Sequence, residues 1–442
     1  MPSTLTFDEY ELTMSQAFWR AGRTHEVAFE LSLRSLPRGW GYVVAAGLAD
    51  ALDFLADFAL APEDLAALRA TSHFDAEFLD ACAGIRFRGD VDAIAEATPV
   101  GPGTPLLRVT APRIEASLVE GALLAIVSHQ SAVATTARRI VDAAAGRPVS
   151  DFSLRRLPGL GAARATARAA WIGGVAATAT TSAGVDLGVP TTGTMAHHFV
   201  LAYGPAGEQR AFEDFLREFP DRAVVVVDTF DPTHGVLRAI AASRATGIAL
   251  RGVRLDSGDL DAESRQARAL LDAEGFGATQ IVATNDLDEH AIESLVRAGA
   301  PIDAFGVGTA LAVASAARGV SAVYKLVAQR TADGWEPVMK LSAGKASDPG
   351  RHQVWRQAPD RDVIALVDEP VAGVPLLAPV MRAGRVLAGQ PTLDQVRQYG
   401  GAAVAELGPM LRRAQAPQSL AVSASPGLAL LRQQLADATR PN

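Results

Sequence analysis

Residues 223–259, AVVVVDTFDPTHGVLRAIAASRATGIALRGVRLDSGD, decide the fold of this chain. Four consecutive valines end at Asp228, a helical pattern of apolar residues follows over 234–245, and a second apolar run ends at Asp256. A continuous apolar strand, a helix and another apolar strand are typical of a parallel sheet that is buried on both faces. We therefore expect Asp228 and Asp256 to lie at the carboxyl ends of two strands.

The same alternation of apolar strand and helix extends over residues 147–330. Six such units in series suit a (β/α) barrel, and an open doubly wound sheet is the alternative. One of the predicted strands is GVPTTGTMAHH, residues 188–198. The predicted helices cover residues 162–183, 207–218, 234–245, 260–274, 287–298 and 309–317. In both architectures ligands bind beyond the carboxyl ends of the strands, which is where this chain places its polar residues.

The segments on either side, residues 1–146 and 331–442, mix helical spacing with β-type alternation. We expect them to pack together, because both are too irregular to extend the barrel. Helices are predicted over residues 5–20, 47–59, 114–145 (as one helix or two), 402–415 and 425–437. Strands are predicted over residues 26–33, within the β-rich region 85–110, and in hairpins after residue 330.

Composition excludes several classes of function. The chain has 442 residues, and 49% of them are hydrophobic, so it can bury large cores. The 41 basic against 49 acidic side chains give a net charge of −8, which argues against nucleic acid as a partner. A single cysteine, Cys82, excludes a disulfide framework, and no apolar run approaches the roughly 20 residues of a membrane span. The N-terminus lacks the pattern of a signal peptide, so we expect a cytoplasmic enzyme.

The segment VRLDSGDL carries the richest set of polar groups at a strand end. Asp256 and Asp259 flank Ser257 and Gly258. Two carboxylates beside a hydroxyl can bind a ribose diol or a magnesium-bound diphosphate, and Arg254 can pair with an anion. The competing interpretation is a turn with a helix N-cap, in which Ser257 or Asp259 opens the next helix.

Two further strand ends carry weaker signals. In GVGT, the residues Gly306, Gly308 and Thr309 would let backbone amides approach a phosphate, and a tight turn is the alternative. His197 and His198 follow another predicted strand. Adjacent residues of a strand face opposite sides, so one histidine would face the site while the other packs.

Asp228 and Asp231 both follow the valine strand, and a helix N-cap explains one of them but not both. Phe152, Arg155 and Arg156 supply an aromatic ring and two cations at a further strand end; the arginines suit a carboxylate or a phosphate, or form a surface salt bridge. Groups that bind anions and diols favour a phosphorylated sugar as substrate. No GxxxxGK[ST] motif is present, so ATP, if used, does not occupy a P-loop.

These motifs resemble those of the nicotinate phosphoribosyltransferases, a type II phosphoribosyltransferase family, along nearly the whole chain. The resemblance is carried, in chain order, by DEYELTM, AFELSLR, YVVAAGL, FRGDVDAIAEATPV, DFSLRR, WIGGVAATATTSAGVDLGVPTTGTMAHH, VDTFDPTHGV, GVRLDSGDL, IVATNDLDE, DAFGVGT, VYKLV and KLSAGKASDPGRHQVWR. It implies an atypical barrel beside an α/β domain built from both termini, in a homodimer with shared active sites. The implied reaction joins nicotinate to phosphoribosyl diphosphate, giving nicotinate mononucleotide and diphosphate. It is coupled to ATP hydrolysis through a phosphohistidine, with Mg²⁺ bound through the diphosphate.

The resemblance also implies the roles of individual residues. His197 corresponds to the histidine that becomes phosphorylated, and Asp228 to the carboxylate that orients it. Arg254 and Asp256 correspond to the strand end at the base and the ribose. The other substrate-binding residues that it implies are Asp8, Tyr10, Arg34, Phe152, Arg155, Thr178, Ser257, Gly258, Asp286, Gly306, Gly308 and Thr309.

Within that set, Tyr10 and Phe152 would sandwich the pyridine ring, and Gly306 to Thr309 would hold the 5′-phosphate. Three alternatives stay open. Nicotinamide is the first alternative substrate, and a quinolinate-using decarboxylating relative is the second. The third is a ligand-binding paralogue without activity, because His198 stands where the family carries a serine.

Overall fold

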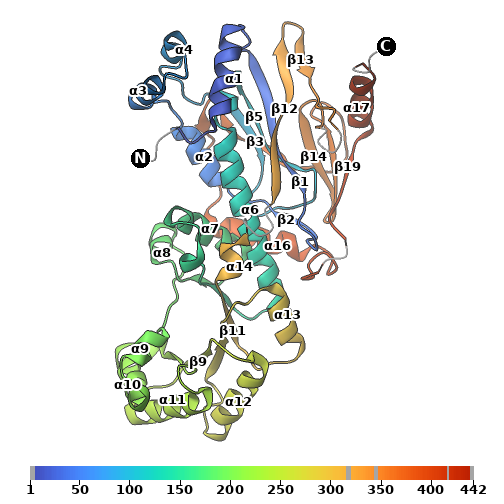
Figure 1. Cartoon of the computed structure of the whole chain (residues 1–442). Coiled ribbons are helices and arrows are strands. Elements are labelled where there is room, and N and C mark those ends of the chain that lie inside the picture. Colours follow the sequence, from blue (N-terminus) through green and yellow to red (C-terminus); the bar gives the residue numbers. More distant parts are fainter. Residues whose placement is uncertain (1–4, 315–319, 343–346, 416–417, 439–442) are drawn as a thin grey trace. The chain divides into compact units, whose positions relative to one another are not determined.

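The computed structural model describes residues 5–314, 320–342, 347–415 and 418–438. The chain divides into two compact units, which we call the central unit (residues 133–317) and the terminal unit (residues 1–132 and 318–442) (Figure 1). The terminal unit is therefore built from both ends of the chain. The boundaries expected from sequence, after residues 146 and 330, lie further along the chain than these.

A six-stranded parallel sheet forms the centre of the central unit. Val225, Val226 and Val253 in this sheet are completely buried, as expected for parallel strands. In spatial order the strands are β7 (Ala177–Thr178), β6 (Val149–Asp151), β11 (Ala304–Val307), β10 (Gln280–Ala283), β9 (Gly252–Leu255) and β8 (Val224–Val226). The predicted α/β class with a parallel sheet is confirmed, and the sheet is a half-barrel.

The sheet does not close. In the part of the chain that the structure describes, β7 and β8 are its two edges and do not pair with each other. The strand predicted over 188–198 is wrong: only Thr191 makes a single bridge, to Thr178. Pro190 has no N–H to give to a ladder, and the flanking glycines favour loop conformations. The sixth strand is instead β7, which interrupts the helix predicted over 162–183.

The central unit's helices follow its strands. Asp231, Asp259 and Asp288 cap α11, α12 and α13, because each carboxylate accepts a hydrogen bond from the first-turn backbone. The helices are α7 (Ala163–Gly173), α8 (Thr181–Leu187), α9 (His197–Leu201), α10 (Glu208–Glu218), α11 (Pro232–Thr246), α12 (Leu260–Ala273), α13 (Glu289–Arg297) and α14 (Thr309–Ala312). The 3₁₀ turns are η1 (Leu154–Arg156), η2 (Leu160–Ala162), η3 (Pro205–Gly207) and η4 (Pro220–Arg222). Residues 315–317 of the last predicted helix lie outside the described residues.

His197 and His198 are the first two residues of α9 and do not end a strand. The prediction that strand alternation turns them to opposite sides is therefore wrong. His198 is exposed and His197 is half-buried.

The terminal unit is built on an antiparallel sheet that joins the two ends of the chain. Strand β1 pairs with β12, and Glu30 lies opposite Lys325. The seven-stranded sheet runs β13 (Gly334–Pro337), β12 (Ser321–Thr331), β1 (Glu26–Ser35), β5 (Pro105–Pro112), β3 (Asp90–Ile94), β17 (Leu377–Arg382) and β18 (Arg385–Val386). A four-stranded sheet runs β16 (Val374–Pro375), β14 (His352–Ala358), β15 (Arg361–Leu366) and β19 (Ala421–Ala424), and β2 (Val43–Val44) pairs with β4 (Pro99–Val100).

Most helices of the terminal unit match the prediction. The region 114–145 forms two helices, and the helix predicted over 425–437 is confirmed. The helix predicted over 402–415 is wrong, because α16 ends at Ala405 just before Gly408 and Pro409, which disfavour a helix. The helices are α1 (Glu9–Arg20), α2 (Leu48–Asp57), α3 (Pro62–Thr71), α4 (Ala76–Ala81), α5 (Arg113–Leu118), α6 (Glu120–Ala143, which continues into the central unit), α16 (Leu393–Ala405) and α17 (Pro426–Ala438). Of the described helices, none has the length and apolar character that crossing a membrane requires.

Candidate active site

The carboxylate of Asp228 organises the strand ends of the central unit. Its side chain is completely buried, just after β8. Its Oδ2 accepts two hydrogen bonds of 2.7 Å, from the backbone N–H of Asp256 and from the Ser257 hydroxyl. Its Oδ1 is buried and accepts no hydrogen bond from any described residue. Because Asp231 caps the next helix, Asp228 has no capping role and is available to a ligand.

His197 lies against this carboxylate pair. Its Nε2 is 3.3 Å from Oδ2 of Asp256 and 4.0 Å from Oδ1 of Asp228. Its Nδ1 is 3.1 Å from the hydroxyl of Thr229. Both ring nitrogens therefore have a polar neighbour that fixes the orientation of the ring, while 37% of the side chain stays exposed. Thr229 was not singled out from sequence, although it directly follows Asp228.

Asp256 is held from both sides. The hydroxyl of Thr284, at the end of β10, donates to its Oδ1, and His197 approaches its Oδ2. Asp259 caps α12 with hydrogen bonds from two backbone N–H groups, so the capping interpretation applies to Asp259 and not to Asp256. Thr284 is a site residue that sequence reasoning missed; its position two residues before the predicted Asp286 was the available signal.

Arg254 precedes this loop on β9. Its Nε is buried and donates to no acceptor in the described ranges. Burial lowers the pKa of Arg254, and the nearby carboxylates of Asp256 and Asp228 act in the opposite direction. A half-buried guanidinium with an unused donor beside two carboxylates is suited to bind an anion.

A cavity of about 180 Å³ opens at the ends of β6, β10 and β11. Both Arg155 and Arg156 line it, so neither turns wholly away from the site. Its lining residues are Phe152, Arg155, Arg156, Asp256, Thr284, Asn285, Asp286, Gly306, Gly308 and Thr309. Seven of these ten residues are among the predicted substrate-binding or catalytic residues. The other three are Arg156, Thr284 and Asn285.

Glycine at position 306 makes room for the aromatic wall of this cavity. A Cβ there would lie 2.3 Å from the ring of Phe152 and 2.6 Å from Thr284. Gly308 is also constrained, since its Cβ would lie 3.0 Å from the carbonyl oxygen of Phe152. Thr309 donates a 2.9 Å hydrogen bond to Oδ1 of Asp286, and both residues line the cavity.

Glu263 of α12 covers the glycine of the DSGD loop. Gly258 has a φ of +70°, and a Cβ on it would lie 1.9 Å from Oε1 of Glu263. Burial, and then the charges of Asp228 and Asp259, raise the pKa of Glu263. The side chain of Glu263 could move aside, so the left-handed φ is what favours glycine at this position. Glu263 had no signal in the sequence, because it looks like an ordinary helix residue.

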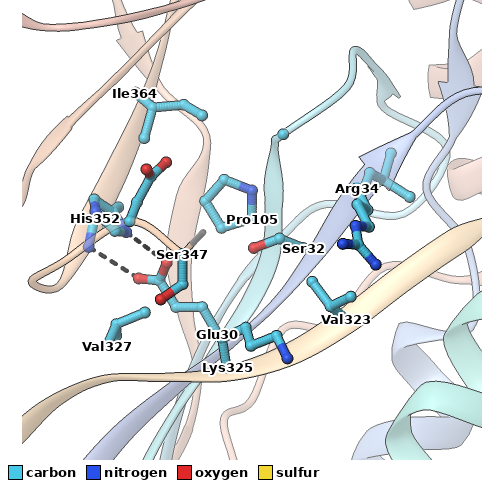
Figure 2. A pocket seen from close by; sticks show the side chains of 13 residues that line it. Glu30, Ser32, Arg34, Pro105, Val323, Lys325, Val327, Ser347, His352 and Ile364 are labelled. Atoms are coloured by element: carbon cyan, nitrogen blue, oxygen red, sulfur yellow. Dashed lines mark hydrogen bonds and ion pairs between the residues drawn. The ribbon is translucent and has the colours of Figure 1, made fainter. Parts of the chain in front are cut away.

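The remaining predicted residues lie elsewhere. Thr178 is fully buried, and its hydroxyl donates a 2.7 Å hydrogen bond to Asp151. Thr178 therefore joins β7 to β6 rather than lining the cavity. Asp8, Tyr10 and Arg34 belong to the terminal unit. Arg34 lines a second cavity of about 180 Å³, within that unit (Figure 2). Glu30 and His352 line the same cavity and form a buried pair, with 2.6 Å between Nδ1 of His352 and Oε2 of Glu30 (Figure 2).

Comparison with known proteins agrees with these features. Sequence profiles for the N-terminal and C-terminal domains of nicotinate phosphoribosyltransferase match residues 5–128 and 352–432. The chain is 43% identical over 412 residues to the nicotinate phosphoribosyltransferase pncB2 of Mycobacterium tuberculosis, covering 92% of this chain and 88% of the relative. It is 38% identical over 380 residues to the nicotinate phosphoribosyltransferase of Bacillus subtilis, covering 83% and 77%.

Solved structures show the same likeness. Human nicotinic acid phosphoribosyltransferase superimposes with a TM-score of 0.84 at 26% identity, covering 97% of this chain and 99% of that one. A nicotinate-nucleotide pyrophosphorylase from Pyrococcus furiosus shares the fold, with a TM-score of 0.74 at 24% identity over 91% of this chain and 95% of that one. Since the similarity in sequence extends over nearly the whole chain, this protein belongs to the nicotinate phosphoribosyltransferase family.

Proposed function

We propose that this chain transfers the phosphoribosyl group of phosphoribosyl diphosphate to nicotinate and couples the transfer to hydrolysis of ATP. The observation that carries the proposal is the arrangement of His197 between Asp256 and Thr229, next to the buried Asp228. Relatives that are 38–43% identical over most of the chain bear the name of this activity.

The transfer breaks the bond between the anomeric carbon and a diphosphate oxygen and forms a bond to the pyridine nitrogen. Positive charge develops on the ribose as the leaving group departs, so a fixed carboxylate near the ring stabilises the transition state. In the proposal this carboxylate is Asp256, which Thr284 and His197 hold in place. In the proposal Arg254 contacts the base, and Phe152 stacks on the pyridine ring.

The rest of the cavity binds the phosphorylated sugar. In the proposal Gly306, Gly308 and Thr309 hold the 5′-phosphate through backbone and hydroxyl groups, and Asp286 orients Thr309. Ser257 and Gly258 contribute the loop that follows β9. Thr178 supports the strand that carries Phe152 and does not contact the substrate, since its hydroxyl is occupied by Asp151.

In the ATP step, the lone pair of one ring nitrogen of His197 attacks the γ-phosphorus while the bond to the ADP oxygen breaks. The other ring nitrogen keeps its proton and donates a hydrogen bond to Asp256 or Thr229. Incubation with γ-labelled ATP should give an acid-labile protein label in wild type and in His198→Ala, but none in His197→Ala. A label that survives in His197→Ala, or that is lost only in His198→Ala, contradicts the assignment.

Nicotinate is preferred over nicotinamide in this proposal, because Arg155 and Arg156 line the cavity and Arg254 precedes it. Only the acid offers these cations a carboxylate. The test is an assay of mononucleotide formation with nicotinate and nicotinamide in parallel, each with and without ATP. Faster turnover of nicotinamide would reverse the substrate assignment, and labelling by ATP without turnover of either base would indicate a ligand-binding paralogue.

Magnesium arrives with the diphosphate in this proposal. Across residues 5–314 and the later described ranges, no group of three or more His, Cys, Asp or Glu side chains is placed to hold a metal ion. Diphosphate oxygens are hard ligands that suit Mg²⁺. Chelation of divalent ions should therefore stop the transfer without changing the melting temperature of the protein. A large drop in that temperature would point to a metal site within the protein.

A homodimer with shared sites is the finer part of the proposal, and it rests on the family resemblance together with the two-fold symmetry usual for such dimers. In it, Asp8 and Tyr10 of one subunit complete the pyridine site of the other, and Arg34 reaches the phosphates. Mixing inactive Tyr10→Ala with inactive His197→Ala under subunit exchange should restore a fraction of the activity. Proven mixed dimers that remain inactive would show that Tyr10 acts within its own subunit.

A further inference from the structure

The first turn of α1 packs against the first turn of α6 within the terminal unit. Glu11 of α1 is completely buried, and its Oε1 accepts a 3.1 Å hydrogen bond from the backbone N–H of Gly121. Gly121 has no side chain to separate the helices; a Cβ there would lie 3.4 Å from Oε1 of Glu11. Asp8 precedes α1 without a capping hydrogen bond from its side chain. Glu11 is therefore a group that ties the start of α1 to α6.

Tyr10 is held at the same place. Its hydroxyl donates a hydrogen bond to Glu120, the first residue of α6, while 48% of the residue stays exposed. Burial and the charges of Glu120 and Glu11 raise the pKa of Tyr10 to about 12, so the hydroxyl keeps its proton. The position of the aromatic ring thus depends on a junction that is held by the carboxyl groups of Glu11 and Glu120.

Every element that packs on this junction contributes to its charge balance. Burial raises the pKa of Glu120, while the hydrogen bond from Tyr10 and the charge of Lys325 on β12 act in the opposite direction. The buried Tyr324, also on β12, donates a hydrogen bond to the carbonyl oxygen of Ala116. From α5, Arg113 lies over the ring of Phe18, at the far end of α1. From α1 itself come Asp8, Tyr10 and Glu11. Lys325 thus offsets the charge of Glu120, whereas no cation contributes to the shift of Glu11.

The geometry of this junction disfavours negative charge on Glu11 and Glu120 at the same time. Oε2 of Glu11 is buried and has no hydrogen-bond partner in the described part of the chain. A buried, ionised carboxylate needs hydrogen-bond donors at both of its oxygens, whereas a protonated carboxyl group needs fewer donors. Burial and the charge of Glu120 accordingly raise the pKa of Glu11 to about 7. The junction therefore gains a second negative charge as the pH rises through neutrality.

We propose that Glu11 is a positioning residue for the pyridine base, which fixes the ring of Tyr10 through the α1–α6 junction in a proton-dependent manner. The protonated carboxyl holds the start of α1 against Gly121. The ionised carboxylate is repelled by Glu120, loosens the junction and moves the ring. This inference rests on the proposed function in one respect only, namely that Tyr10 contacts the base.

The kinetic test compares wild type with Glu11→Gln and Glu9→Gln. Gln keeps an acceptor for Gly121 and cannot ionise, and Glu9 is an exposed glutamate of the same helix that serves as matched control. If only the protonated junction binds the base, the KM for nicotinate of wild type rises up to about tenfold between pH 6 and pH 8, as the competent fraction falls. Glu9→Gln should follow wild type, while Glu11→Gln should keep a flat KM, with kcat little changed. A KM that rises equally in Glu11→Gln would overturn the proposal.

A spectroscopic test separates this inference from the proposed function. The chain has five tyrosines, so 3-fluorotyrosine labelling gives a small ¹⁹F spectrum in which Tyr10→Phe assigns the Tyr10 signal. The Tyr10 signal of wild type should titrate with a midpoint near pH 7, and this titration should vanish in Glu11→Gln. If Glu11→Gln does not fold, Glu120→Gln should move the midpoint to lower pH. A Tyr10 signal that is constant from pH 5.5 to 8.5 in wild type would refute the inference, whereas a titrating signal in a protein that does not use nicotinate would refute only the function.

Discussion

Two groups of buried charges, one in each unit of this molecule, are arranged in opposite ways. In the central unit, charges collect where parallel strands end, and some of their polar atoms remain without partners among the described residues, such as Oδ1 of Asp228 and Nε of Arg254. In the terminal unit, a group of charges lies inside the antiparallel sheets, and its members satisfy one another. Glu30, Arg108 and His352 there are 2%, 7% and 2% exposed.

The buried group of the terminal unit is fully connected. Nδ1 of His352 lies 2.6 Å from Glu30, and its Nε2 lies 3.2 Å from the carbonyl oxygen of Pro349. Since a carbonyl and a carboxylate can only accept, both ring nitrogens donate and the ring is cationic. Arg108 donates to the carbonyl of His352 and to Asp92, which extends the network across β5 and β3.

The difference teaches how to separate structural charges from functional ones. A buried charge whose donors and acceptors are all matched serves the fold, because matching removes most of the cost of burial. A buried charge with an orphaned atom at a strand end is costly to the fold and is explained by a ligand. Asp228 and Arg254 belong to the second kind, and Glu30 and His352 to the first.

The largest effect should come from breaking the matched network. His352→Leu removes the nearer of the two cations beside the buried carboxylate of Glu30 and leaves Arg108, 3.9 Å away, which should lower the free energy of unfolding by about 3–5 kcal/mol. Urea unfolding of the full chain measures this. His73→Leu is the control, because its pair with Glu9 is exposed and its loss should cost less than about 1 kcal/mol. Equal costs for the two variants would remove the distinction between the networks.

The stability lost in His352→Leu should depend on pH. The charge of Glu30 raises the pKa of His352 above its usual value, against the effect of burial. The stabilisation from this proton is complete below the unfolded pKa of about 6.5 and is lost as pH rises through the higher folded pKa. The gap in stability between wild type and His352→Leu should therefore narrow as pH is raised above 6.5. A gap that widens with pH would show that His352 is neutral in the folded protein.

In the central unit, Asp256→Asn should affect the reaction and not the fold. The variant keeps the shape of the side chain and removes the charge that would face the ribose. We expect a roughly 10²-fold loss in kcat/KM, equivalent to about 2.7 kcal/mol, with a nearly unchanged melting temperature. An unchanged rate with a collapsed melting temperature would assign Asp256 to the fold.

Gly306→Ala should have a smaller effect on the same cavity. The added methyl group would lie 2.3 Å from the ring of Phe152, so the ring must move. Because Phe152 would then stack less well on the pyridine ring, the KM for nicotinate should rise on the order of tenfold. Gly161→Ala, in a loop of the same unit with open space around its Cβ, is the matched control and should behave as wild type. Equal KM values in both variants would place the pyridine ring away from Phe152.

The smallest effect should come from Asp259→Ala, three residues from Asp256. This variant removes the cap of α12 and should lower the free energy of unfolding by about 1 kcal/mol. At a temperature where the variant is fully folded, its kcat/KM should equal that of wild type. Thermal unfolding and steady-state kinetics measure the two parts. A loss of rate comparable to that of Asp256→Asn would mean that both carboxylates of the loop contact substrate.

The sequence by itself determined the elements and much of the chemistry. Runs such as VVVV before Asp228 predict buried parallel strands, because a strand covered on both faces cannot alternate. For Asp228 and Asp231, the rule that one cap suffices for one helix indicates that one of the two carboxylates has another role. The motifs also indicate the family, and Phe152, Arg155, Asp256 and Gly306, which they single out, line one cavity.

Only the tertiary structure decided the remainder. Whether the sheet closes depends on which segment becomes its edge, and a two-residue strand at Ala177–Thr178 leaves almost no periodicity to detect. Thr229 and Thr284 became site residues because folding brings their hydroxyls to His197 and Asp256. Glu30 and His352 are 322 residues apart in the chain and meet inside the sheets. Periodicity and capping are local properties that a short window of sequence contains, whereas hydrogen bonds between distant segments depend on the path of the whole chain.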